Sequence, residues 1–231
     1  MRLSPSTWQQ PVPAERTTPR TALLDTLAAE VTVRPGRLVV AVDGSTGAGK
    51  TSFAHELGLA LERHGRPVLR ACLDDHKRPW SERHRYDRTS GEGYYRTATD
   101  LDRVRMSLVG AFCDGPDVAL CGIDPLTQVD HREDRTGVGP DDVLVVDGVF
   151  VLRPELRDLW DVVVRLVVDP DVALERAVGR DTGREGYAEA RTLHVERYGA
   201  ADTVYRAEAD PDARADVLVD NTDLDRPVRL R

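Results

Sequence analysis

A glycine-rich octapeptide at residues 44–51 constrains this chain more than any other feature of its sequence. It reads Gly-Ser-Thr-Gly-Ala-Gly-Lys-Thr and matches the pattern G-x-x-x-x-G-K-[ST], in which glycines let backbone N–H groups surround a phosphate. Five apolar residues, 38–42, precede it, and an amphipathic pattern over residues 51–64 follows it. A loop between a strand and a helix lies at the helix N-terminus, which attracts anions. The sequence therefore predicts a nucleoside triphosphate site.

The loop also predicts individual roles. Lys50 is expected to reach the β- and γ-phosphates of ATP or GTP, and the Thr51 hydroxyl to bind Mg²⁺. A second metal ligand, Asp147, follows the apolar run 143–146. A carboxylate at the end of a neighbouring buried strand can hold Mg²⁺ directly or through water. The remaining candidates for phosphate binding are Gly44, Ser45, Thr46, Gly47, Ala48, Gly49 and Ser52.

Short apolar runs alternate with helical patterns along the rest of the chain. Further runs cover residues 67–73, 162–168 and 217–219, and helical patterns cover 21–31, 100–112, 171–180 and about 185–197. Strands that alternate with helices form parallel sheets covered on both faces. We therefore expect an α/β fold of the P-loop NTPase type with a five-stranded parallel sheet. We also expect a hairpin insertion within 117–130, turning at 122–125, and a helical lid at about 176–200.

Composition limits the classes of function. The chain has 231 residues and a formal charge of −8, which argues against a nucleic-acid-binding face. No apolar run approaches the ~20 residues that span a bilayer. Three cysteines without Cys-x-x-Cys spacing, Cys72, Cys113 and Cys121, favour a cytoplasmic location over a disulfide framework. The polar residues 1–20 predict a flexible leader, and 21–231 a single domain.

Several segments over about residues 38–221 together resemble the uridine kinase and phosphoribulokinase branch of the P-loop kinases. In that branch, the strand after the P-loop helix ends in an acidic residue that acts as general base toward the acceptor hydroxyl. Asp74 and Asp75 follow the corresponding run here, and the resemblance aligns Asp74 with the base. Such a carboxylate can orient and deprotonate a hydroxyl during phosphoryl transfer.

The resemblance also implies acceptor-binding side chains. The stretch 92–102 resembles a segment in which an acidic residue binds ribose hydroxyls. Asp100 is the expected contact, Asp102 is the competitor, and a helix cap by Asp100 is the structural alternative. Tyr94 and Tyr95 are candidates to line the acceptor pocket, with packing in the core as the alternative.

Recognition of a pyrimidine base is expected at the hairpin. Uridine and cytidine kinases often place a Tyr and a His there, with an Arg nearby. His131 and Arg132 are the candidates in this chain, in a shifted register and without the Tyr.

Residues 174–184 resemble the arginine-bearing lid of the same branch. Arginines there clamp the transferring phosphoryl group and exclude water when the lid closes. Arg180 and Arg184 are the first candidates for these clamps, and Arg176 is the next candidate. Near the C-terminus, Asn221 or Thr222 is expected close to the adenine through backbone groups.

The resemblance implies an ATP-dependent kinase that phosphorylates a hydroxyl, first the 5′-hydroxyl of uridine or cytidine. Pantothenate, a sugar or sugar phosphate, glycerate and nicotinamide riboside are alternative acceptors, because the P-loop, the base and the lid arginines would serve all of them. A nucleotide-dependent switch is a third hypothesis and would need loops that order around the γ-phosphate. The expected ligands are ATP or GTP, Mg²⁺ and a small hydroxyl-bearing substrate, with no nucleic acid and no membrane; a homo-oligomer is left open.

Overall fold

A computed structural model describes residues 1–8, 17–85 and 90–231 of the chain. Its centre is a sheet with the strand order β1-β3-β6-β2-β7-β8-β9, and a separate antiparallel pair joins β4 to β5. Within the described ranges, neighbouring strands of the main sheet are parallel except β8 and β9. The strands are β1 (Arg2–Leu3), β2 (Leu38–Gly44), β3 (Val68–Cys72), β4 (Asp117–Val118), β5 (Thr136–Gly137), β6 (Val143–Asp147), β7 (Val162–Val167), β8 (Val217–Asp220) and β9 (Val228–Arg229).

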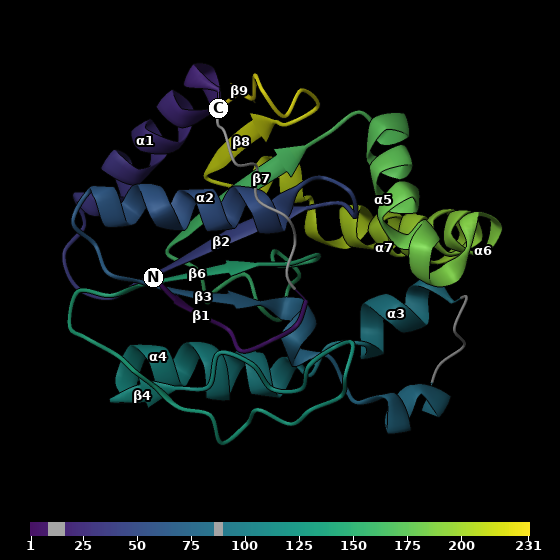
Figure 1. Ribbon diagram of the computed structural model, residues 1–231, viewed down its shortest axis with the longest axis horizontal. Helices are drawn as coiled ribbons and strands as arrows, with labels where there is room; N and C mark the ends of the chain where they lie inside the picture. The colour runs from purple at the N-terminus through teal and green to yellow at the C-terminus, as the bar shows by residue number, and fades with distance from the viewer. Residues whose placement is uncertain (9–16, 86–89) are drawn as a thin grey trace.

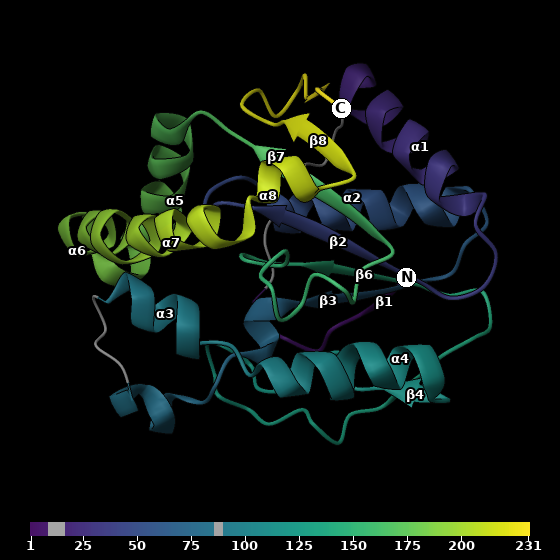
Figure 2. The same ribbon diagram turned by 180° about the vertical axis from the view of Figure 1, so that it is seen from behind.

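The helices fall into three groups around the sheet (Figures 1 and 2). One group covers one face of the sheet, a second covers the opposite face, and a third stands at the end where the parallel strands finish. They are α1 (Thr18–Thr32) and α2 (Lys50–Arg63) on the first face; π-helical η3 (Arg103–Gly110) and α4 (Ala111–Asp114) on the second; and α3 (Gly91–Thr97), α5 (Pro170–Glu185), α6 (Tyr187–Thr192), π-helical η4 (Leu193–Gly199) and α7 (Ala200–Ala209) at the strand ends. Shorter pieces are η1 (Leu73–His76), η2 (Trp80–Arg85) and α8 (Pro211–Arg214).

Both faces of β2, β3, β6 and β7 are buried. In β2, Val39 and Ala41 belong to one apolar cluster, whereas Val40 and Val42 belong to the other. Successive side chains of a strand point to opposite faces, so a strand buried on both faces reads as a continuous apolar run. This confirms the α/β fold and the five central strands expected from the sequence. The structure adds two short edge strands, β1 and β9.

The expected flexible leader and the expected hairpin are organised differently from the prediction. Within the expected flexible leader, β1 pairs with β3 and so covers an edge of the sheet that would otherwise be free. Helix α1 begins at Thr18, with Pro in its first turn. Residues 9–16 of the leader lie outside the described part of the chain. The hairpin extends to β5, which pairs with β4, whereas the prediction had it end by residue 130. Its turn lies beyond Asp124, whose carboxylate accepts the N–H groups of Leu126 and Thr127, both at 2.8 Å.

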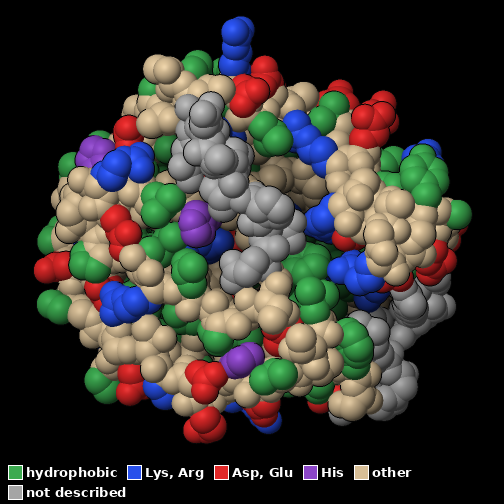
Figure 3. Space-filling model, viewed as in Figure 1, with side chains coloured by type: hydrophobic (Ala, Val, Ile, Leu, Met, Phe, Trp, Pro, Cys, Tyr) green, Lys and Arg blue, Asp and Glu red, His purple; other side chains and the backbone are tan. Residues whose placement is uncertain are grey.

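Acidic and basic side chains are interspersed on the face seen in Figure 3, with Lys and Arg side chains gathered beside the α5–α6 end. Among the described helices, none has both the length and the apolar character needed to cross a lipid bilayer.

Candidate active site

The P-loop joins the end of β2 to the start of α2, and its glycines are required by its shape. Gly47 and Gly49 both have φ of 84°, a conformation that disfavours side chains with a Cβ. A Cβ on Gly47 would also lie 2.1 Å from the carbonyl oxygen of Ala173 in α5. Glycine therefore lets the loop curve tightly and lets α5 approach it closely.

The loop is supported from behind by a buried polar chain. The Asn221 side chain donates from Nδ2 to the carbonyl of Ala48 at 2.8 Å and accepts from Arg20 at 3.0 Å. Arg20 in turn pairs with buried Glu56 at 2.6 Å. Arg176 donates to the carbonyl of Asn221 at 3.2 Å, which directs it toward the end of β8. These contacts fix the loop; contact of Asn221 or Thr222 with a purine stays a prediction.

The two expected metal ligands face each other at the end of the sheet. The Thr51 hydroxyl donates to Oδ2 of Asp147 at 2.6 Å. Oδ1 of Asp147 accepts from Arg70 at 2.7 Å, and Arg70 also donates to the carbonyls of Ala71 and Val145, both at 2.8 Å. The buried guanidinium thus orients the Asp147 side chain and leaves its other oxygen beside the Thr51 hydroxyl.

This pair fits Mg²⁺ held mainly by phosphate and water. Magnesium at phosphate sites takes one or two protein oxygens and completes its shell with phosphates and water. Thr51 and Asp147 offer two such oxygens, and no group of three or more His, Cys, Asp or Glu side chains in the described ranges could hold a metal ion. The donors therefore match a nucleotide-bound Mg²⁺ better than a site built from protein alone.

Sequence reasoning missed Arg70. A charged residue inside the apolar run of β3 is a usable signal, because a buried charge requires a partner. Its partner in β6 was not identifiable from the sequence, since the two strands are brought together only by the fold.

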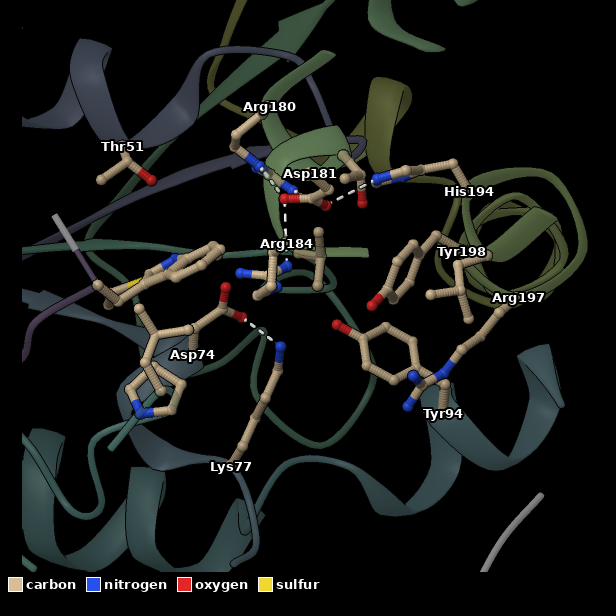
Figure 4. A pocket seen from close by; sticks show the side chains of 18 of the residues that line it. Thr51, Asp74, Lys77, Tyr94, Arg180, Asp181, Arg184, His194, Arg197 and Tyr198 are labelled. Atoms are coloured by element: carbon tan, nitrogen blue, oxygen red, sulfur yellow. Dashed lines mark hydrogen bonds and ion pairs between the residues drawn. The ribbon is translucent and has the colours of Figure 1, made fainter. Parts of the chain in front are cut away.

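Asp74 and Asp75 have different surroundings although they are adjacent in η1. Asp74 is partly exposed and pairs with Lys77, Oδ1 to Nζ, at 2.9 Å (Figure 4). Burial would raise the pKa of Asp74, but the positive charges of Lys77, Lys50 and Arg180 outweigh it and hold the pKa below its usual value. Asp75 is buried and accepts from Ser4 at 2.6 Å; burial raises its pKa to about 7.

Lys50 extends along the P-loop, where its ammonium donates to the carbonyl of Ser45 at 2.8 Å. Burial lowers the pKa of Lys50, and the nearby carboxylates of Asp147, Asp74 and Asp43 oppose that shift. Two of these carboxylates, Asp147 and Asp74, are the expected metal ligand and the expected base.

A cavity of about 750 Å³ lies at the carboxyl ends of the strands. Open α/β sheets bind ligands at this end. The cavity collects the expected phosphate, metal, base and clamp residues in one place, and its walls include Thr46, Lys50, Thr51, Asp74, Asp147, Arg180 and Arg184.

The two clamp arginines are organised by one carboxylate. Asp181 accepts from Arg180 through two bonds of 2.9 Å and lies 3.2 Å from Arg184. It also contacts His194 of η4 at 2.9 Å (Figure 4). Burial opposes ionisation of Asp181, but the bonds from His194 and Arg180 hold its pKa well below the usual range. Asp181 therefore joins the clamp arginines of α5 to η4.

Two expected acceptor contacts do not line the cavity. Tyr95 is buried against Phe150 and Tyr205, with ring centroids 5.2 and 6.2 Å apart. Asp100 accepts the backbone N–H of Arg103 at 3.2 Å, which is the helix-capping alternative. Tyr95 is held by aromatic rings and by the guanidinium of Arg153, 4.5 Å from its ring centroid, and Asp100 is held by its cap hydrogen bond.

The two expected base contacts also lie outside the cavity walls. His131 pairs with Asp134 at 2.7 Å. Arg132 pairs with Asp130 two residues before it, with Nε 2.8 Å from each carboxylate oxygen. Each side chain is held by an acidic neighbour in the same loop, so the structure does not bring them to the acceptor space.

A basic and aromatic wall faces the P-loop instead. Lys77 lies 5.3 Å from the ring centroid of Tyr94, Arg197 lies 4.5 Å from it, and Tyr198 contacts the same ring edge-on at 5.0 Å. Figure 4 shows the hydroxyls of Tyr94 and Tyr198 pointing into the cavity. Only Tyr94 was expected from the sequence, because Lys77, Arg197 and Tyr198 belong to no contiguous motif.

Curated proteins similar to this chain include uridine kinases. No protein-family model matches it. A uridine kinase of Halobacterium salinarum is 27% identical over 148 residues, which cover 64% of each chain. A uridine kinase of Lactobacillus helveticus is 23% identical over 201 residues, covering 79% of this chain and 85% of that protein. The match thus spans less than two thirds of the first relative and most of the second.

Solved structures agree on the fold. The structure of a possible uridine kinase from Bacillus stearothermophilus has a TM-score of 0.65 at 24% identity, covering 84% of this chain and 96% of that one. A D-glycerate 3-kinase from Cryptococcus neoformans has a TM-score of 0.52 at 14% identity over 84% of this chain and 87% of that one. Together with the P-loop site, these findings show that the chain is similar in sequence to uridine kinases and shares the P-loop kinase fold.

Proposed function

We propose that this protein is an ATP-dependent kinase that transfers the γ-phosphoryl group to a hydroxyl of a small acceptor, with uridine and cytidine as the first acceptors to test. One observation carries the proposal: Asp74, ionised beside Lys77, lines the same cavity as Lys50 and Thr51 of the P-loop. A carboxylate facing a triphosphate site is the arrangement that a general base for phosphoryl transfer needs.

Each group has a role in the proposed reaction. Asp74 accepts the proton of the acceptor hydroxyl while the acceptor oxygen bonds to the γ-phosphorus and the bond to the ADP oxygen breaks. Lys50 binds the phosphates, and Arg180 and Arg184 bind the transferring group as its charge spreads over the outer oxygens. Thr51 and Asp147 would hold Mg²⁺, which neutralises phosphate charge when bound.

A second acceptor class is supported by the cavity walls. His131 and Arg132, the residues expected to recognise a pyrimidine, are paired outside the cavity, whereas Lys77 and Arg197 lie in its wall around Tyr94. Cations in an acceptor pocket favour an acceptor with a carboxylate or phosphate. Glycerate, pantothenate and a sugar phosphate therefore belong in the same test as the nucleosides.

The test is an ADP-release assay with ATP and Mg²⁺ against uridine, cytidine, pantothenate, glycerate, nicotinamide riboside and ribulose 5-phosphate. The proposal expects one acceptor class to raise the rate at least about a hundredfold above hydrolysis without acceptor, the scale of general base catalysis. Slow hydrolysis that no acceptor stimulates would contradict it and favour a nucleotide-dependent switch.

A further inference from the structure

The first eight residues follow the sheet edge to the cavity and are anchored along the way. After β1, the Ser4 hydroxyl donates to Asp75 at 2.6 Å. The Thr7 backbone N–H and hydroxyl donate to the two carboxylate oxygens of Asp124 at 2.6 and 3.0 Å. Both aspartates are buried, so the segment is tied to the core of the protein immediately before Trp8.

Trp8 meets the two clamp arginines. Its ring lies 5.3 Å from the guanidinium carbon of Arg180 and 5.7 Å from that of Arg184, and it lines the same cavity as Asp74. One indole thus contacts two cations in a partly enclosed site, where cation–π attraction is stronger than at an exposed surface.

The indole and Asp181 hold the arginines in different ways. Asp181 accepts N–H groups of Arg180 in the guanidinium plane, whereas cation–π contact with an indole needs no N–H hydrogen bond. Phosphoryl oxygens bind guanidinium N–H groups, so contact with Trp8 does not compete for the donors that a clamp requires. Fixing long side chains before the reaction reduces the entropy lost at the transition state.

We propose that Trp8 is a positioning residue of the phosphoryl-transfer site: the anchored N-terminal segment brings its indole against Arg180 and Arg184 and holds both arginines toward the transferring group. The proposal rests on the proposed kinase function, in which these arginines contact the γ-phosphoryl group. Trp8 lies in the segment that the sequence predicted to be a flexible leader.

The kinetic test compares Trp8→Ala with the wild type. Because the arginines act mainly on the transition state, Trp8→Ala is expected to lower kcat about tenfold, the size expected for two cation–π contacts, with KM for ATP unchanged within about twofold. Trp8→Phe should restore kcat to within about threefold. The exposed substitution Val33→Ala is the matched control and should leave both constants unchanged.

A second variant removes the anchors and keeps the indole. Ser4→Ala combined with Thr7→Ala deletes two side-chain hydrogen bonds of the segment and should lower kcat by an intermediate factor of about three. Equal kcat in the wild type, Trp8→Ala and this double variant would overturn the positioning role.

Tryptophan fluorescence provides a readout that does not depend on turnover. Trp80 also lines the cavity, so the titration with a non-hydrolysable ATP analogue and Mg²⁺ uses the double variant Trp80→Phe/Trp160→Phe, in which Trp8 is the one remaining tryptophan of the sequence. The emission of this variant should change when the analogue binds. Binding of the analogue without a change in emission would overturn the placement of Trp8 at the triphosphate site.

The two proposals fail in different ways. A Trp8-dependent response to the analogue without transfer to any acceptor would refute the kinase function and support the placement of Trp8 at the triphosphate site. Normal transfer by Trp8→Ala would refute the role of Trp8 and leave the kinase function intact.

Discussion

The proposed base depends on one neighbouring side chain, Lys77. Its ammonium is 2.9 Å from the Asp74 carboxylate, and it is the main charge that offsets the effect of burial on the pKa of Asp74. A base with a lowered pKa is already deprotonated at neutral pH, and its activity is lost only in acid.

Lys77→Met should therefore move the acid limb of the pH profile of kcat/KM to higher pH. Without the ammonium, burial raises the pKa of Asp74, so the base is protonated earlier as pH falls. The control Arg105→Met removes an exposed ion pair with Asp158 and should leave the limb in place. An unmoved acid limb in Lys77→Met would show that this pair does not set the ionisation of the base.

The roles of individual residues were predictable from the sequence where the residues belong to a contiguous motif, and were not predictable where the residues are isolated. The P-loop glycines, Lys50 and Thr51 follow from one octapeptide, because each role is set by its neighbours in the chain. Arg70 and Trp8 act through partners in distant segments. Their side chains carry no local pattern that identifies those partners.

Two helical elements, α5 and η4, contribute the clamp arginines and His194 to the wall of the cavity. Asp181 connects them through Arg180, Arg184 and His194. The sequence predicted an arginine-bearing lid at about 176–200, and the structure has α5, α6 and η4 there; closure of this lid stays a prediction.

Arg180→Met should lower kcat by a factor on the order of a hundred or more, because it removes donors to the transferring phosphoryl group from a largely enclosed site. The affinity for ADP should change little, since ADP lacks that group. Arg191→Met, a substitution of an exposed arginine in α6, serves as the control. Equal loss of ADP affinity and of kcat would instead indicate general damage to the nucleotide site.

Helices and strands were predictable from the sequence where burial imposes a regular pattern of apolar residues. Strands β2, β3, β6 and β7 are buried on both faces and read as largely apolar runs, whereas β8 is recognised by a shorter run whose alternate residues are buried. The edge strands β1 and β9 span two residues each and have no such run. The far arm of the hairpin was missed for the same reason, because β5 is only Thr136–Gly137.

Across the whole molecule, a buried polar network connects the P-loop strand to the C-terminal helices. Arg165 pairs with Asp43 at 2.6 Å, and the Tyr205 hydroxyl donates to Asp43 at 2.9 Å while accepting from the backbone N–H of Leu152 at 3.0 Å. Burial raises the pKa of Tyr205 far above its usual value, so the hydroxyl keeps its proton and can donate.

Tyr205→Phe should lower the free energy of unfolding by about 1–3 kcal/mol, because it leaves a buried N–H and a buried carboxylate without this partner. Urea denaturation measures the change. Tyr187→Phe, at an exposed position, should stay within about 0.5 kcal/mol of the wild type. Equal stability of both variants would mean that the network contributes little to folding.

The most direct test of the central claim compares ATP binding and phosphoryl transfer in the wild type and Asp74→Asn, using the acceptor that the wild type prefers. The amide cannot accept the hydroxyl proton but preserves the shape of the side chain. If Asp74 is the base, ATP affinity should stay within about threefold while transfer falls by about two orders of magnitude or more. Asp158→Asn, at an exposed site, should retain both. Near-normal transfer by Asp74→Asn would contradict the assignment of the base and, with it, the proposed mechanism.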